Sequence, residues 1–415
     1  MAELSIDENL TAFLRGDPQL LRDPYPFYRR LREEAPVRRV GSVVFVSTHA
    51  EARAAYLDNR RLVNESNQTS GPDEALSILS DAEKRTYYEL LDFERGYMSR
   101  MDGEDHNRVR SAAQPAFSTR RIAELEELTQ QLTDELLQEL ARRESPDLME
   151  LAYRLPLLAI TGMLGVPTTD ADLLTRWGDA ITGRRRRMPV QPELIRRAQW
   201  GLTEYRQCVD ELVERTGRRS TTHLGAALSA AEERDELTRE ELVATYALIL
   251  LAGHETTANL IGNGMLALLA QPDQWRILCD DPSLAPSAVE EAFRYDSPVQ
   301  LSLRTAAVDL ELSGVEVPSA TPVWLLIGSA NRDPQAFSNP DDVDITRRPN
   351  GHLGLGHGVH FCLGAPFARL QGQVVFSTLA RSFPGIELAV AAETLPRSAG
   401  ISMRGVRSLP VKLSS

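Results

Sequence analysis

A single cysteine lies in a glycine-rich stretch near the C-terminus, GHGVHFCLGAP, at residues 356–366. Cys362 follows His360 by two residues, and glycines lie on both sides of it. Glycine lets a backbone adopt unusual torsions and approach a flat ligand closely, and a deprotonated sulfur is a metal ligand. A helix is expected directly afterwards, with its positive end toward the sulfur. The pattern alone leaves two interpretations of this free thiol open, a loop that presents a thiolate to a ligand or a small buried cysteine.

A second group of polar residues interrupts a long apolar helix pattern. The segment YALILLAG is apolar on every side, which indicates a helix that runs through the interior, and HETTAN follows it. A buried carboxylate and hydroxyl need partners or a task. Glu255 and Thr256 therefore have two interpretations, a helix bend with hydroxyl back-bonding or a proton relay facing a ligand. Ala252 and Gly253 beside them leave room for a ligand against the helix.

Composition and charge narrow the class of protein. The chain has 415 residues, a net charge of −13 and 42% hydrophobic residues, so it can form a large core but is unsuited to neutralising nucleic-acid phosphates. Three cysteines without a CxxC pair indicate a reducing compartment. The polar, acidic N-terminus resembles no signal peptide, and the apolar run is too short to cross a membrane. We expect a cytoplasmic protein.

The pattern of elements is mainly helical, with small sheets, and predicts one large domain over residues 1–415. Periodicity and turn residues give these expectations: turn residues and then a helix within 23–36, a strand and helix in 41–57, irregular chain over 64–100 with a helical piece near 75–85, a long helix over 119–145, helices between 147 and 215, one long helix over 237–273, a hairpin in 309–330 and ordered coil over 331–351.

Three motifs in fixed order carry a family resemblance. AGHETT, then Glu291 and Arg294 in EEAFRY, then the Cys362 loop resemble the cytochrome P-450 superfamily, in particular its bacterial, actinobacterial-type members. The segments DPYPFYRRLREEAPV, MDGEDHNRVR, RYDSPVQLSLR and ANRDP agree with it. The resemblance implies a mainly α fold with haem b between the long helix and the cysteine loop. It also implies a monooxygenase that activates molecular oxygen.

The resemblance favours the ligand interpretation of Cys362 and assigns roles to individual residues. Cys362 would bind the haem iron, where a thiolate ligand favours O–O cleavage, and Glu255 and Thr256 would deliver protons. The haem propionates need cationic or donor partners, which by motif are His106, Arg110, Arg304 and His360. Further haem-pocket residues are Ala252, Gly253, Leu355, Gly356 and Gly364. A buried ion-pair network would contain Glu291, Arg294 and Arg347, with Arg348 as the alternative third member. Two residues differ from the pattern of the family. Leu355 stands where family members usually have an aromatic residue, and Gln371 stands where a glutamate is common.

Substrate and partners follow less directly. Motif position assigns the substrate pocket to Leu248, Leu251, Val299, Leu301, Ser302 and Ile401, which favours a hydrophobic or amphipathic small molecule and a natural-product tailoring step. Electrons would come from a separate ferredoxin and ferredoxin reductase, docked on Arg108, Arg120 and Arg121. The run Arg184–Arg187 is either a solvated face or a site for an anionic substrate or an acidic carrier protein. Other oxidations on the same scaffold (phenol coupling, nitration or peroxide-driven hydroxylation) and a non-catalytic partner protein are the alternatives.

Overall fold

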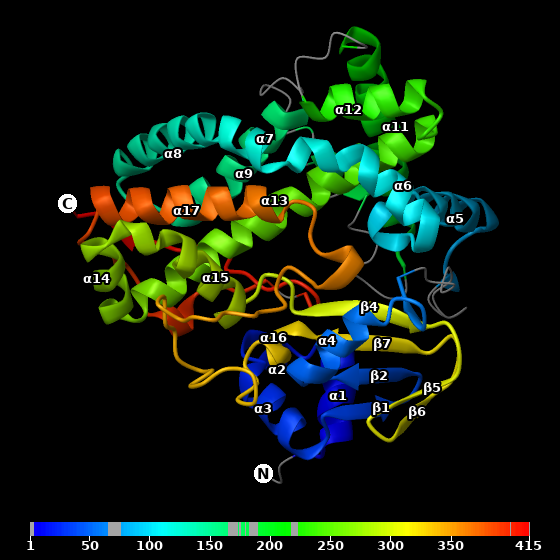
Figure 1. Ribbon diagram of the computed structural model, residues 1–415, viewed down its shortest axis with the longest axis horizontal. Coiled ribbons are helices and arrows are strands. Elements are labelled where there is room, and N and C mark those ends of the chain that lie inside the picture. Colours follow the sequence, from blue (N-terminus) through cyan, green and yellow to red (C-terminus); the bar gives the residue numbers. More distant parts are fainter. Residues whose placement is uncertain are drawn as a thin grey trace. The chain divides into compact units, whose positions relative to one another are not determined.

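The computed structural model describes residues 4–64, 76–164, 173, 176–178, 180–181, 190–216, 223–398 and 400–414 (Figure 1). The chain divides into two compact units, one containing residues 1–63, 125–156 and 255–415 and the other residues 64–124 and 157–254. Helices dominate and the sheets are small, which confirms the predicted fold class. The assignment of a single domain stays a prediction.

The first unit contains a five-stranded sheet. Its order is β1-β2-β7-β4-β3, with β2 and β7 parallel and the other neighbours antiparallel. The strands are β1 (Val37–Val40), β2 (Val43–Val46), β3 (Leu62–Val63), β4 (Leu301–Ala306) and β7 (Pro322–Leu326). The expected hairpin is the separate pair β5 (Leu310–Leu312) and β6 (Val315–Val317). Residues 322–326 leave this hairpin and join the main sheet, because β7 pairs with both β2 and β4.

Helices cover both faces of this sheet. The helices are α1 (Ile6–Leu14), α2 (Pro18–Arg22), α3 (Tyr25–Glu34), α4 (His49–Leu57) and α16 (Ile327–Ala330). Phe45 packs with Leu10 and Phe13 of α1 on one face, whereas Val44 and Val46 pack with residues of α4 on the other. This alternation is the period of two that a strand imposes on its side chains.

The same unit has a larger helical core. Apolar residues of its helices form one buried cluster with the C-terminal half of α13. The elements are α8 (Glu126–Ala141), α9 (Leu148–Leu164), α13 (Arg239–Leu269), α14 (Pro272–Asp280), η7 (Pro282–Leu284), α15 (Ala285–Tyr295), η8 (Gly358–His360), α17 (Ala365–Ser382), β8 (Glu387–Leu388), η9 (Ala392–Thr394) and β9 (Val411–Lys412). Helices α9 and α13 each continue into the second unit.

The second unit is helical in its described part. Its elements are α5 (Asp81–Arg95), η2 (Met98–Arg100), α6 (Gly103–Ala113), η3 (Gln114–Phe117), α7 (Thr119–Glu124), α11 (Pro192–Thr216) and α12 (His223–Glu233). An ion pair between Arg196 of α11 and Glu83 of α5 joins two of these helices. Aromatic packing supplements it, because the Arg206 guanidinium lies 5.1 Å from the centre of the Phe93 ring.

Two sequence expectations for helices were wrong in extent. Residues 64–100 were expected to be irregular apart from a piece near 75–85, but α5 runs from Asp81 to Arg95. Its start is fixed by a capping box, in which the Ser80 hydroxyl accepts from the Glu83 backbone N–H and the Glu83 carboxylate accepts from that of Ser80. The expected helix over 119–145 is interrupted at Leu125, between α7 and α8.

A buried charge cluster joins the N-terminal helices to the C-terminal segment within the first unit. Tyr25 donates a hydrogen bond to Asp296 at 2.6 Å, and Arg404 Nε lies 2.7 Å from the same carboxylate. Burial raises the pKa of the Asp296 carboxyl, but the charges of Arg404 and Arg397 and the Tyr25 hydrogen bond lower it to about 2. Arg404 also donates to the carbonyl oxygens of Leu21 and Arg22. This cluster therefore remains ionised at neutral pH.

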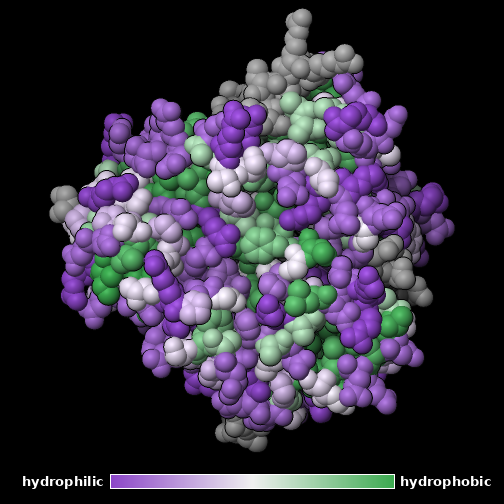
Figure 2. Space-filling view, in the orientation of Figure 1, coloured by the Kyte–Doolittle hydropathy of each residue, from purple (hydrophilic) through white to green (hydrophobic). Residues whose placement is uncertain are grey.

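The surface is polar, as the composition indicates. Most residues on the face drawn in Figure 2 are hydrophilic, and the apolar ones are interspersed among them. Within the described residues, none of the helices has the length and apolar character needed to cross a membrane.

Candidate functional site

The cysteine loop is built by two glycines with left-handed backbones. Gly356 and Gly358 have φ of +73° and +72°, which residues with a Cβ rarely adopt. A Cβ on Gly358 would also lie 3.0 Å from the Tyr56 carbonyl oxygen. The Cys362 N–H donates to the Leu355 carbonyl at 2.9 Å, and this bond closes the loop. The side chain of Cys362 is exposed, just before helix α17 begins at Ala365.

Other loop residues serve the local fold. Leu355 is buried in the helical core cluster, where it packs with residues of α15 and α17. Gly364 is the residue before α17, and a Cβ there would lie 4.0 Å from the Cys362 sulfur. His360 closes the short η8 turn and is partly buried. The Cys362 side chain is therefore exposed, while the buried Leu355 side chain anchors the loop to the helical core.

The Glu291–Arg294 pair is fully buried. Arg294 Nε and Nη2 donate to the two Glu291 oxygens at 2.8 and 2.7 Å, and both side chains are at most 1% exposed. Arg294 also donates to the carbonyl oxygens of Asn331, Pro340 and Asp342. Arg347 Nε lies 3.2 Å from Glu291 and is the third member of the network. The coil over 332–351 is thereby fixed without regular secondary structure.

The adjacent carboxylate, Glu290, binds different partners. Arg369 of α17 donates to both Glu290 oxygens at 2.7 Å, and His352 Nε2 lies 3.1 Å from one of them. Burial raises the Glu290 pKa, but hydrogen bonds from His352 and Arg369 lower it to about 2. The sequence analysis did not single out these three residues, although the i, i+7 relation of Arg369 to Cys362 was available as a signal.

Arg304 of β4 packs against Tyr56 of α4. Its guanidinium is 4.9 Å from the centre of the Tyr56 ring and donates to the Ser302 hydroxyl at 3.0 Å. Arg304 is only 6% exposed. Ser302 helps to orient this arginine, since the two residues are two apart on β4 and share a face, and its place in the substrate pocket stays a prediction.

Leu301 and Ile401, also expected in the substrate pocket, are placed as core residues. Leu301 is on the opposite face of β4 from Arg304 and is buried in the cluster with Leu10 and Phe45. Ile401 packs against the same cluster. Val299 is partly buried and forms a bridge with Met403.

The middle of α13 has an accessible stripe. Ala252 and Glu255 are exposed and Leu248, Leu251 and Thr256 are partly accessible, whereas the residues before and after are mostly buried. Gly253 and His254 are also partly accessible. The accessible stripe of α13 is therefore Leu248 with residues 251–256. A ligand can lie at such a stretch of a buried helix, and it contains both predicted proton-relay residues.

Gly253 lies where α13 packs against α9. A Cβ at this position would lie 2.5 Å from Ile160 Cδ1 of α9. The missing side chain therefore lets α9 and α13 pack closely, and the place of Gly253 in the haem pocket stays a prediction.

Helix α6 carries the remaining predicted propionate partners. His106 is 2% exposed and Arg110 is partly buried, one turn apart on α6. Their neighbour Arg108 lies 2.6 Å from Glu241 and 2.9 Å from Asp105, and the hydrogen bonds that it donates to these carboxylates raise its pKa.

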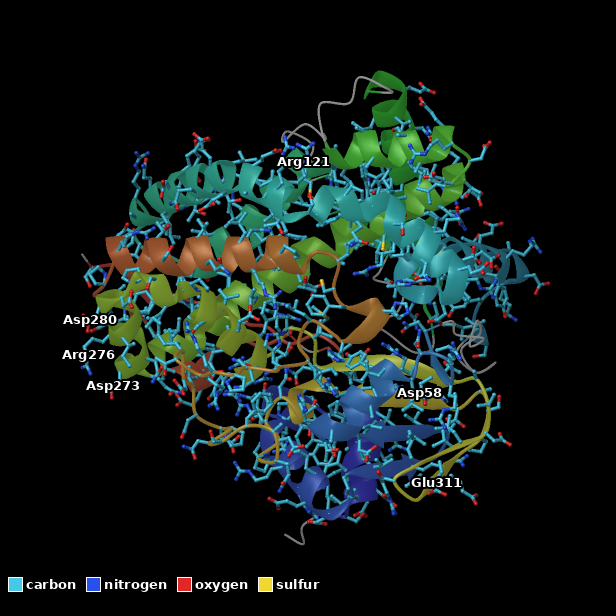
Figure 3. All side chains as sticks on the ribbon, in the orientation of Figure 1. Asp58, Arg121, Asp273, Arg276, Asp280 and Glu311 are labelled. Carbon is cyan, nitrogen blue, oxygen red and sulfur yellow. The ribbon has the colours of Figure 1, made fainter. Side chains whose placement is uncertain are left out.

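The expected docking arginines are all paired with carboxylates. Arg120 and Arg121 lie within 3.4 Å of Glu124, in addition to the pairing of Arg108. These pairings weaken the basic character of the expected surface. Arg121, labelled in Figure 3, lies on α7. The run Arg184–Arg187 lies outside the described residues.

Comparison with known proteins decides the family. The family model described as Cytochrome P-450 matches residues 283–391, which include the Glu291–Arg294 pair and the cysteine loop. The chain is 37% identical over 400 residues to the vitamin D(3) 25-hydroxylase of Pseudonocardia autotrophica, covering 94% of each chain. The chain belongs to the cytochrome P-450 family. It is a haem-dependent monooxygenase that uses haem b, as members of this family do.

Two further relatives are informative. The polyketide biosynthesis cytochrome P-450 PksS of Bacillus subtilis is 34% identical over 406 residues, with 94% of this chain and 96% of the relative covered. The structure of P-450 BioI in complex with an acyl carrier protein ligated to hexadec-9Z-enoic acid matches with a TM-score of 0.83 and 30% identity. It covers 95% of this chain and 100% of that one.

The residues present fit haem. An exposed sulfur lies in a loop shaped by two left-handed glycines, ahead of the positive end of an 18-residue helix. The buried Arg304 supplies a cation suited to a propionate, and α13 offers an accessible stripe with a small residue, Ala252. Each of these features answers a separate chemical need of an anionic, flat, iron-containing group.

The buried arginine network gives the first prediction. Arg294→Lys removes the bidentate contact and most of the carbonyl bonds while retaining the charge. We expect it to lower the free energy of unfolding by about 3 to 5 kcal/mol, the range for disrupting a buried pair, and to reduce haem content. Urea unfolding and the haem-to-protein absorbance ratio measure the two effects.

Arg276→Lys is the matched control for that prediction. Arg276 pairs with Asp273 at the same three-residue spacing, but both side chains are more than two-thirds exposed (Figure 3). Its effect should stay below about 0.5 kcal/mol. Equal effects of the two variants would contradict a special role of the buried network.

Proposed function

We propose that Cys362 is the axial ligand of the haem iron and that the enzyme hydroxylates or epoxidises a hydrophobic or amphipathic small molecule in natural-product biosynthesis. The exposed sulfur of the glycine loop is the observation that supports the ligand assignment. The tailoring role is supported by relatives such as the polyketide biosynthesis enzyme of Bacillus subtilis.

Bound haem supplies the oxidising chemistry: its iron activates O2, and with two electrons and two protons one oxygen atom enters the substrate while the other leaves as water. We assign proton delivery to Glu255 and Thr256. Glu255 is exposed and can exchange protons with water, and Thr256 is the next residue on the accessible stripe. This pair favours oxygen activation over peroxide-driven chemistry. A separate ferredoxin and its reductase supply the electrons.

His106, Arg110, Arg304 and His360 are proposed to bind the haem propionates. The burial of Arg304 and His106 supports this role, since a buried cationic or polar side chain requires charge or hydrogen-bond partners. Leu248 and Leu251 on α13, with Val299, are proposed to line the substrate pocket.

The ligand assignment has a direct spectroscopic test. The dithionite-reduced enzyme with carbon monoxide should show the strongly red-shifted Soret band of thiolate ligation. Cys362→Ser should abolish this band, because serine has no sulfur and cannot supply a thiolate ligand to the iron. Cys279→Ser, which changes a partly buried thiol on α14, is the control and should leave the band intact. A red-shifted band that survives in Cys362→Ser would refute the assignment.

The proton relay predicts a loss of coupling. Thr256→Ala should retain haem and continue to consume NAD(P)H, but product per NAD(P)H should fall at least about tenfold as electrons are diverted to hydrogen peroxide. The adjacent Thr257→Ala is the control, since Thr257 is 3% exposed and lies off the stripe. An unchanged product ratio in Thr256→Ala would show that another group delivers the proton.

A carrier-tethered substrate is the finer proposal for substrate delivery. It is supported by the arginine run 184–187 and by the likeness to an enzyme solved with an acyl carrier protein. The apparent dissociation constant from the haem spin-state titration should be at least about tenfold lower for an acyl chain on an acidic carrier than for the free acid at low ionic strength. Salt should remove much of that advantage. Equal affinities for the two forms would exclude carrier recognition.

A further inference from the structure

Two neighbouring carboxylates on α15 fix two different segments of the chain. Glu291 holds Arg294, Arg347 and the coil that follows α16, as described above. Glu290 instead holds His352 and Arg369. The first of these residues precedes the cysteine loop and the second lies on α17 after it, so a single carboxylate ties together both ends of the loop.

The geometry of this clamp is specific. Arg369 makes a bidentate contact with Glu290, through Nε and Nη2 at 2.7 Å each. Two further contacts orient His352. Its Nδ1 accepts a hydrogen bond from the Gly354 N–H at 3.1 Å, and its ring stacks on that of Phe293 with 5.4 Å between the ring centres. A bidentate arginine–carboxylate contact fixes direction as well as distance, so the position of the Arg369 guanidinium is set by Glu290.

Arg369 also lies near the residue that precedes the cysteine. Its guanidinium carbon lies 5.9 Å from the centre of the Phe361 ring, next to Cys362 in the chain. The Glu290 hydrogen bond raises the Arg369 pKa, and the charge of Cys362 contributes in the same direction. A cation near a thiolate withdraws electron density from it, and a carboxylate beside that cation compensates in part.

We infer that Glu290 and Arg369 are positioning residues for the sulfur, and that their opposed charges set the electron donation of Cys362 to the iron. This inference rests on the proposed ligand role of Cys362. The pair touches neither substrate nor oxygen, and acts only through the loop and its electrostatic field.

Reduction potentials of two single-charge variants test the inference. Glu290→Gln leaves the Arg369 charge uncompensated, which should stabilise the ferrous state. Arg369→Gln leaves Glu290 uncompensated by arginine, which should stabilise the ferric state. At a fixed applied potential, the ferrous-to-ferric ratio should rise in the first variant and fall in the second, each by roughly three- to tenfold. The double variant should return close to the native ratio.

Opposite shifts support the inference, whereas shifts in one direction, or none, at full haem content overturn it. Glu139→Gln is the control: it removes a carboxylate from an exposed pair with Arg154 in the same unit, and should leave the ratio unchanged. If a single variant loses haem, the double variant provides the test, since neither residue of the pair then carries a charge. A native haem content and a native reduction potential in the double variant support the inference, and loss of haem from the double variant overturns it.

The carbon monoxide spectrum of the unmodified enzyme separates this inference from the proposed function. A red-shifted band, combined with no opposite changes of the ferrous-to-ferric ratio in the two single variants, would retain Cys362 as the ligand and reject the positioning role of Glu290 and Arg369. Absence of that band in the unmodified enzyme would reject the ligand assignment itself.

Discussion

The buried contact between Glu291 and Arg294 is the interaction on which the surroundings of the cysteine loop depend. Removing two charges from water is costly, and the cost is offset only where every donor has an acceptor. Here the arginine meets that condition with carboxylate oxygens and three backbone carbonyls. Those carbonyls belong to chain without regular secondary structure, so the arginine supplies the hydrogen bonds that backbone N–H groups would supply in a helix or strand.

Helix α15 therefore organises the chain around the cysteine loop through two consecutive side chains. Glu291 orders the coil that leads toward the loop, and Glu290 orders the loop's two flanks through His352 and Arg369. The loop itself then needs only its glycines and the Cys362–Leu355 backbone bond to keep its form. Two carboxylates on neighbouring positions of one helix thus hold the segments before and after Cys362, and rigid support of this kind is what a precisely positioned side chain requires.

The sequence was informative where a motif or a period carried the signal. The long helix α13 and the mainly helical class followed from apolar periodicity, and the family followed from three ordered motifs. The packing of Gly253 and Leu301 could not be derived from the sequence, because it depends on Ile160 and on residues packed against the far face of β4, which are distant in sequence. Glu290 was missed because its partners, unlike the i+3 partner of Glu291, lie far along the chain.

The cluster around Asp296 has a consequence for how the chain is made. Residues 21–25 are synthesised well before Arg404, which is one of the groups that fix them. This segment must therefore wait without that anchor while the intervening chain of more than 370 residues is made. Such contacts between distant residues slow folding, and a nascent chain stalled before Arg404 would lack the anchor of residues 21–25.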